Sequence, residues 1–105
     1  MSSAENTHGW TFLSNHAQVL LCIARDPEMR LRDIAQAVGI TERAAQRIVV
    51  DLVETGYVDR EKVGRRNHYR LNGEVRMRHV AQADYEINEL LNVFQLPAES
   101  HGDSR

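Results

Sequence analysis

Apolar residues recur at helical spacing in the first half of the chain, and they predict three helices. The first begins after Ser14, a suitable N-cap, and runs to about Arg25, where Asp26-Pro27 ends it. Its apolar positions form two stripes instead of one. A helix that is apolar on two sides is usually covered from two directions, so we expect other elements to pack around this helix.

The second and third predicted helices are closely connected. The second covers about residues 32–38, and Gly39 ends it in a left-handed turn that a residue with a Cβ resists. Thr41 is a suitable N-cap for the third helix, which continues to Thr55. The segment 29–31, before the second helix, is too short for a helix and is predicted to form a small strand.

After the third helix the pattern changes from helical to alternating. Residues 57–63 and 68–71 are predicted strands, and residues 64–67 are the turn of a hairpin between them. A last helix is predicted from about Val80 to Gln95. The fold class is therefore mainly α with a small β-hairpin, in the order helix, short strand, helix, helix, two-stranded hairpin, helix.

Length and composition are those of one ordinary domain. With 105 residues, of which 42% are hydrophobic and 27% charged, the chain can build one modest core. We expect the domain to span residues 10–96, with disordered polar tails at residues 1–9 and 97–105. No apolar run approaches the roughly 18 residues of a membrane span, and no signal-peptide pattern is present. A single cysteine is typical of a reducing cytoplasm.

Charge is unevenly distributed along the chain. Residues 30–70 carry nine Lys or Arg against six Asp or Glu, whereas residues 1–29 and 71–105 are both net acidic. A basic middle between acidic ends is expected when one face of a protein meets a polyanion. An excess of arginine that only solvates a surface gives the same pattern, so charge alone leaves both interpretations open.

The predicted third helix has an apolar and a polar face. With successive residues about 100° apart, the apolar face contains Ala45, Ile48, Val49 and Leu52. Arg43, Gln46 and Arg47 fall on the opposite face. Arg can pair with guanine and Gln with adenine, so this face suits the major groove of DNA. Taken alone, it could equally be a solvated face.

The predicted hairpin is basic. Its turn and flanks contain Arg60, Lys62, Arg65, Arg66, His68 and Arg70, with Asp59 and Glu61 as the only acids. Gly64 permits a tight turn, and the arginines at the tip could reach phosphates or a narrow minor groove. Tyr69 and Leu71 alternate with basic residues, so they can pack on the core while the basic residues stay outside.

Four runs within residues 31–71 carry a family resemblance: Leu31-Arg32-Asp33-Ile34-Ala35, Val38-Gly39-Ile40-Thr41, Ile48-Val49-Val50-Asp51-Leu52-Val53-Glu54-Thr55-Gly56-Tyr57-Val58 and Gly64-Arg65-Arg66-Asn67-His68-Tyr69-Arg70-Leu71. They resemble the winged helix-turn-helix domains of bacterial and archaeal regulators of the ArsR and MarR type. The resemblance implies that the third helix is the recognition helix and that the hairpin is the wing. The candidate DNA-binding residues are Thr41, Arg43, Gln46, Arg47, Arg65, Arg66, His68 and Arg70.

The predicted last helix has the spacing of a helix–helix seam. Val80, Ile87 and Phe94 recur every seven residues, with Ala83 and Leu90 between them. So short a seam needs a second surface, which the apolar first helix offers together with Trp10 and Phe12. The candidate dimer interface is therefore Trp10, Phe12, Val80, Ala83, Ile87, Leu90 and Phe94. Alternatively, both terminal helices only cover their own domain.

Nothing in the sequence indicates catalysis, a metal or a cofactor. Metal-responsive members of the ArsR group carry a cysteine pair near the recognition helix, whereas this chain has only Cys22, which is expected to be a small core residue. Its five histidines show no ligand spacing. The predicted function is that of a homodimeric, nucleoid-associated transcription regulator that binds double-stranded DNA. The alternative is a winged helix that serves as a protein-interaction module in a larger complex.

Overall fold

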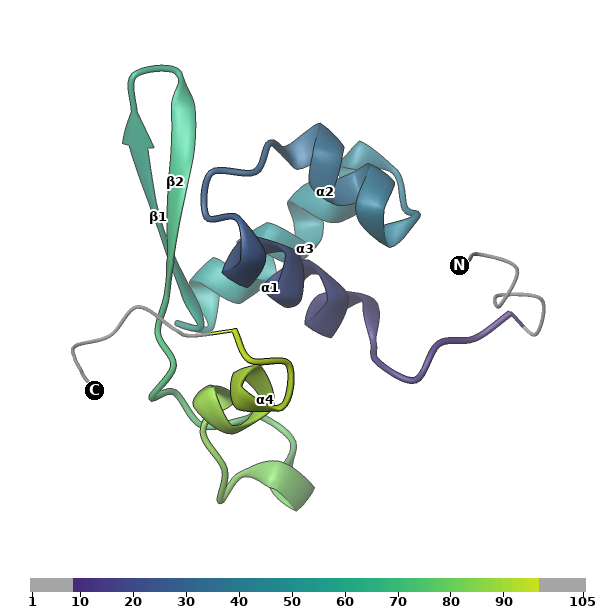
Figure 1. Ribbon diagram of the computed structural model, residues 1–105, viewed down its shortest axis with the longest axis vertical. Helices are drawn as coiled ribbons and strands as arrows, with labels where there is room; N and C mark the ends of the chain where they lie inside the picture. Colours follow the sequence, from purple (N-terminus) through teal and green to yellow (C-terminus); the bar gives the residue numbers. More distant parts are fainter. Residues whose placement is uncertain (1–8, 97–105) are drawn as a thin grey trace.

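The computed structural model describes residues 9–96. Three helices come first in the chain: α1 (Asn15–Arg25), α2 (Leu31–Val38) and α3 (Glu42–Glu54). A hairpin follows, made of β1 (Val58–Val63) and β2 (Arg66–Leu71), and then the short 3₁₀ helix η2 (Val80–Gln82) and α4 (Ile87–Val93) (Figure 1). The structure thus confirms a mainly α fold with a small hairpin. The expected tails at residues 1–9 and 97–105 lie outside the described residues, except for Gly9.

The ends of the first three helices follow from local chemistry. The hydroxyl oxygen of Ser14 accepts a hydrogen bond from the Ala17 N–H at 3.2 Å, and the hydroxyl of Thr41 accepts one from the Ala44 N–H at 3.0 Å. Gly39 ends α2 with a φ of 89°, in the left-handed region that favours glycine. Both predicted N-caps and the predicted glycine stop are confirmed.

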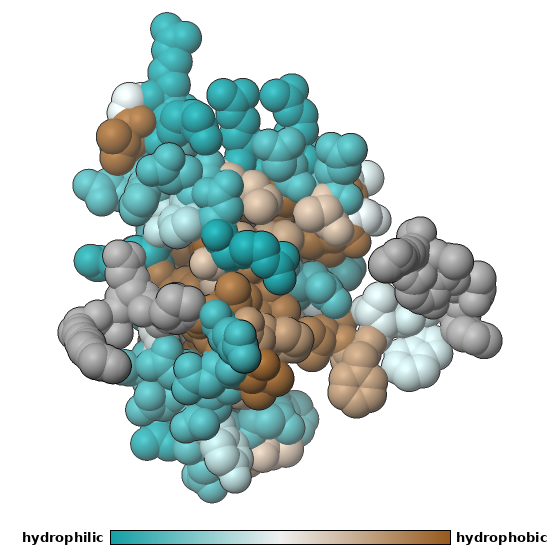
Figure 2. Space-filling model, in the orientation of Figure 1, coloured by the Kyte–Doolittle hydropathy of each residue, from teal (hydrophilic) through white to brown (hydrophobic). Residues whose placement is uncertain are grey.

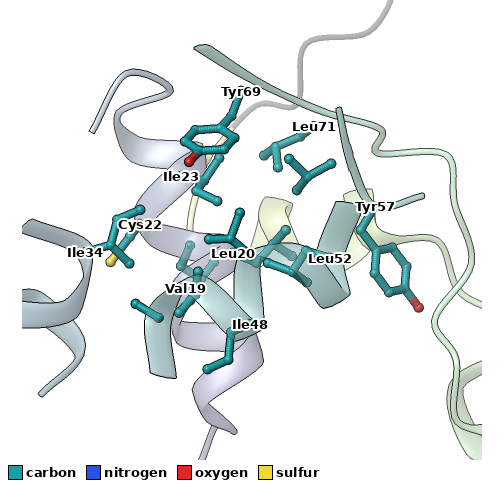
Figure 3. Close-up of a cluster of buried hydrophobic side chains, with 14 of the residues drawn as sticks. Val19, Leu20, Cys22, Ile23, Ile34, Ile48, Leu52, Tyr57, Tyr69 and Leu71 are labelled. Carbon is teal, nitrogen blue, oxygen red and sulfur yellow. The ribbon is translucent and has the colours of Figure 1, made fainter. Parts of the chain in front are cut away.

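The core is organised around α1. All residues from Val19 to Ile23 are buried, and α1 packs against α2, α3 and β2. Buried side chains of the three helices and the hairpin point toward one another in Figure 3, among them Ile34, Leu52 and Tyr69. The expectation that other elements cover α1 from more than one direction is therefore confirmed.

The hairpin is antiparallel, with a register that runs from Val58 opposite Leu71 to Val63 opposite Arg66. Tyr69 and Leu71 are buried while Arg66 and Arg70 are exposed, which confirms the predicted alternation along the returning strand. The turn is shorter than the predicted residues 64–67. Because pairing continues to Arg66, only Gly64 and Arg65 connect the strands, and Gly64 has the positive φ of 66° that such a tight turn requires.

The strand predicted at residues 29–31 is wrong, because Leu31 is already the first residue of α2. The preceding segment does lie beside β2, where the Tyr69 N–H donates to the Pro27 carbonyl at 2.9 Å. It cannot continue as a ladder, since proline has no N–H and the Met29 N–H closes a turn onto the Asp26 carbonyl at 3.0 Å. One backbone contact takes the place of a third strand.

The continuous helix predicted from Val80 to Gln95 is also wrong. The chain turns back after η2, and the first N–H groups of α4 donate to an earlier segment. The Ile87 N–H bonds to the Val75 carbonyl and the Asn88 N–H to the Gly73 carbonyl, both at 2.9 Å. These bonds satisfy N–H groups that a helix start leaves without a partner, so a new helix begins here instead of continuing an old one.

This break removes the predicted seam, because Val80 and Ile87 no longer share a helix. Val80 is 85% exposed, whereas Ile87 is 5% exposed and packs in the core of its own chain. Of the other expected seam residues, Ala83 and Leu90 are half-buried and Phe94 is exposed. The heptad spacing of these residues therefore reflects no continuous helical stripe.

Ile87→Ala removes a buried side chain of α4, and we expect the free energy of unfolding to fall by about 2–5 kcal/mol. Val93→Ala, at an exposed position of the same helix, should change it by less than about 0.5 kcal/mol. Urea denaturation followed by circular dichroism measures both values. Equally small effects of the two substitutions would show that Ile87 is not part of this core.

Candidate nucleic-acid interface

The two faces of α3 have different surroundings. Ala45, Ile48, Val49 and Leu52 are buried, and through this side α3 packs against α1, α2 and β1. The side chains of Arg43, Gln46 and Arg47 are exposed, and none of them makes a hydrogen bond or ion pair with another described residue. The structure therefore presents these polar groups together, with their donors and acceptors available to a partner outside the chain.

Thr41 differs from the other three predicted residues of this helix. It is exposed, but its hydroxyl oxygen is engaged with the Ala44 N–H as the N-cap of α3. The hydroxyl keeps its own proton to donate. The described contact of Thr41 is thus with the start of its own helix.

The wing, defined as the hairpin residues 58–71, has two faces with different charges. Register and alternation place Arg60 and Lys62 on the face that contains Asn67 and Tyr69. The other face carries Asp59, Glu61, Arg66, His68 and Arg70, with acids opposite His68 and Arg70 across the strands. The basic excess of the wing therefore lies on the first face and at the turn, where Arg65 is exposed.

Each basic residue of β2 has a partner inside the molecule. Arg70 Nη2 lies 3.2 Å from Asp59 Oδ2, and His68 Nδ1 lies 3.3 Å from Glu28 Oε2. Arg66 Nη2 donates to the backbone carbonyl of Glu28 at 2.8 Å. In contrast, Arg65 makes no hydrogen bond or ion pair with another described residue. Four of the eight predicted DNA-binding residues therefore have a partner within the protein, whereas Arg43, Gln46, Arg47 and Arg65 have none among the described residues. The four with a partner are Thr41, Arg66, His68 and Arg70.

A groove of about 390 Å³ separates the wing from the start of α2. It is lined by Glu28, Met29, Arg30, Leu31, Arg65, Arg66, Asn67 and Tyr69. Hydrophilic side chains gather over this part of the molecule in Figure 2, where the wing and α2 lie in the view of Figure 1. Neither Arg30 nor Glu28 stands out in the sequence, because only the fold brings the segment between α1 and α2 against the wing.

The stretch of chain that contains α1, α2, α3 and β1 matches a known family. A family model described as the MarR family matches residues 8–66, more than half of the chain, from before α1 to the first residue of β2.

The chain belongs to the MarR family.

It is accordingly a DNA-binding transcription regulator with a winged-helix fold, as the sequence predicts. No match was found among curated proteins.

A contact between two side chains joins α1 to α3 in this MarR-family domain. His16 Nε2 lies 2.9 Å from Asp51 Oδ2 and connects α1 to the exposed side of α3.

Cys22 is buried, and this burial raises the pKa of its thiol, an effect that nearby Arg25 only partly opposes. A buried thiol with a raised pKa is a poor nucleophile. Cys22 packs in the hydrophobic core, as expected.

The described part of the chain shows neither a metal site nor a membrane span. Within residues 9–96, no group of three or more His, Cys, Asp or Glu side chains could hold a metal ion. No helix in the same residues is long and apolar enough to cross a membrane.

Both expected dimer residues before α1 are exposed. Trp10 is 67% and Phe12 91% exposed, and their segment runs away from the helices in Figure 1. Within the described residues these two side chains extend beyond the core of their own chain.

Thr41→Ala removes the side-chain cap of α3, and we expect it to lower the free energy of unfolding by about 1 kcal/mol. Thr41→Ser keeps a hydroxyl in the same position and should retain most of the stability. Thermal or urea denaturation of the three proteins checks this. If Thr41→Ala is as stable as the unmutated protein, the cap contributes nothing to α3.

Proposed function

We propose that this MarR-family regulator binds a palindromic duplex operator as a homodimer, with α3 in the major groove and the wing on the DNA backbone or in the minor groove. The observation that carries the proposal is the exposed set of Arg43, Gln46 and Arg47. These side chains have no partner among the described residues and lie opposite the buried face of α3. A rigid helix held by its apolar face thus offers groups that can read base edges.

The chemistry of this helix face matches what the major groove displays. Arg donates two hydrogen bonds to O6 and N7 of guanine, and the Gln amide pairs with N6 and N7 of adenine. The side chain of Ala44, between Arg43 and Ala45, is small and half-buried, so it leaves room for close approach to the bases. Arg43, Gln46 and Arg47 are therefore the proposed base-reading residues, and Thr41 supports them as the cap.

The wing supplies positive charge to the complex but does not read the base sequence. Arg65 at the turn and Arg60 and Lys62 on β1 are exposed cations that no described residue pairs with. Cations that neutralise phosphates release counterions, so they raise affinity for every duplex and make binding dependent on salt. His68 and Arg70, which are paired within the protein, are expected to contribute less.

A homodimer is proposed because the described chain exposes large apolar side chains that its own core does not cover. Trp10, Phe12, Val80 and Phe94 are exposed, and burying them in a second copy removes apolar surface from water. A two-fold dimer also places two recognition helices about 34 Å apart, one turn of DNA. Ile87 is left out of this interface, since it belongs to the core of its own chain.

Gln46→Ala should relax base preference at one operator position in each half-site, because one bidentate contact is worth about 1–3 kcal/mol of discrimination. Sequencing the duplexes that each protein selects from a random pool, followed by titration of single-base variants, measures this. Gln82→Ala, at an exposed Gln of η2, is the matched control and should leave selection unchanged. A uniform loss of affinity for all duplexes would exclude Gln46 as a base reader.

Phe12→Glu places a charge in the proposed interface and should convert the dimer to a monomer. We expect affinity for a palindromic duplex to fall by about 10²-fold, since two linked half-sites no longer bind together. Sedimentation and duplex titration measure the two effects. Asn15→Glu adds the same charge at an exposed polar position of α1 and should leave both unchanged. An unmutated protein that is monomeric at micromolar concentration would contradict the dimer.

A further inference from the structure

We propose that the two adjacent arginines of the wing have different roles: Arg66 is a positioning residue that holds the wing against the segment between α1 and α2, and Arg65 is the phosphate contact. The proposal rests on the DNA-binding mode proposed above, which it divides residue by residue. The two side chains differ in their contacts within the protein. The Arg66 guanidinium has an internal acceptor and the Arg65 guanidinium has none among the described residues.

Three contacts attach β2 to residues 27 and 28. The Tyr69 N–H donates to the Pro27 carbonyl at 2.9 Å, and His68 Nδ1 lies 3.3 Å from Glu28 Oε2. Arg66 Nη2 donates to the Glu28 carbonyl at 2.8 Å, a hydrogen bond that the charge of the guanidinium strengthens. Arg66 makes the outermost of these contacts, because Val63 opposite Arg66 is the last pair before the turn.

The outer half of the wing has little other support. The buried side chains of the hairpin are Val58, Tyr69 and Leu71, and every residue of β1 after Val58 is exposed. A two-stranded hairpin without a packed face is only marginally stable in water. The direction of the outer half of the wing therefore depends on the contacts of β2 with residues 27 and 28.

Holding the wing in this direction matters for the groove beside it. Arg30 and Arg65 both line the 390 Å³ groove between the wing and the start of α2, and so does Arg66. The hydrogen bond from Arg66 to the Glu28 carbonyl keeps the wing at a fixed distance from the start of α2, and this distance sets the width of the groove. Arg65 is then presented to a DNA backbone without the cost of ordering the wing on binding.

The experiment compares Arg65→Ala with Arg66→Ala by two measurements. The first is the slope of log K against log salt for binding to an operator duplex and to a random duplex. Arg65→Ala should lower the slope by about 1 for each protomer, because one phosphate contact is lost. Arg66→Ala should leave the slope unchanged while it lowers affinity several-fold for both duplexes.

The second measurement is amide hydrogen exchange of the wing in the protein without DNA. Arg66→Ala should speed exchange of the Tyr69 N–H and of the outer wing amides several-fold, and Arg65→Ala should not. Arg66→Lys keeps a long cationic donor and should restore most of the protection and affinity. Glu28→Ala keeps the backbone carbonyl that Arg66 uses, so it should have a smaller effect than Arg66→Ala.

Different failures have different meanings. A lowered salt slope in Arg66→Ala, or unchanged exchange of its wing amides, would overturn the positioning role. An unchanged slope in Arg65→Ala would overturn its role as phosphate contact. If the unmutated protein shows no salt-dependent binding to any duplex, the DNA-binding mode itself fails, while the exchange experiment still decides whether Arg66 anchors the wing.

Discussion

Five consecutive residues of α1, Val19 to Ile23, are buried, so this part of the helix has no side that faces solvent. No single neighbour can cover a helix all round, and here α2, α3 and β2 each take one side. The position of α3 and that of the wing are thereby fixed relative to the same element. The spacing between the polar face of α3 and the base of the wing is therefore a consequence of how α1 is buried.

The parts of the fold that sequence reasoning predicted are those where local chemistry and burial agree. The apolar face of α3, its cap at Thr41 and the stop at Gly39 depend on residues next to one another in the chain. The alternation of Tyr69 and Leu71 with basic residues is a property of one strand. In each case residues within one helix, turn or strand determine the local structure.

The parts that were missed depend on contacts between distant segments. Val80 to Gln95 has heptad spacing, but the Val75 carbonyl accepts from the Ile87 N–H and starts a new helix there. Segment 29–31 has no pattern that reveals that the Met29 N–H is used in a turn. Likewise, nothing near Arg66 in the sequence points to the Glu28 carbonyl, 38 residues earlier. Such backbone acceptors are present at every residue, so no residue type marks them.

The exposed side of β1 has a consequence for how the protein behaves at high concentration. β1 pairs only with β2 among the described strands, so its other edge carries backbone groups that a strand of another molecule could bind. Of the five exposed residues on that strand, Asp59, Arg60, Glu61 and Lys62 alternate in sign, and only Val63 is apolar. An incoming strand would have to strip water from these charges, which disfavours edge-to-edge aggregation. The same charged residues that shape the wing thus help to keep separate molecules from joining into an extended sheet.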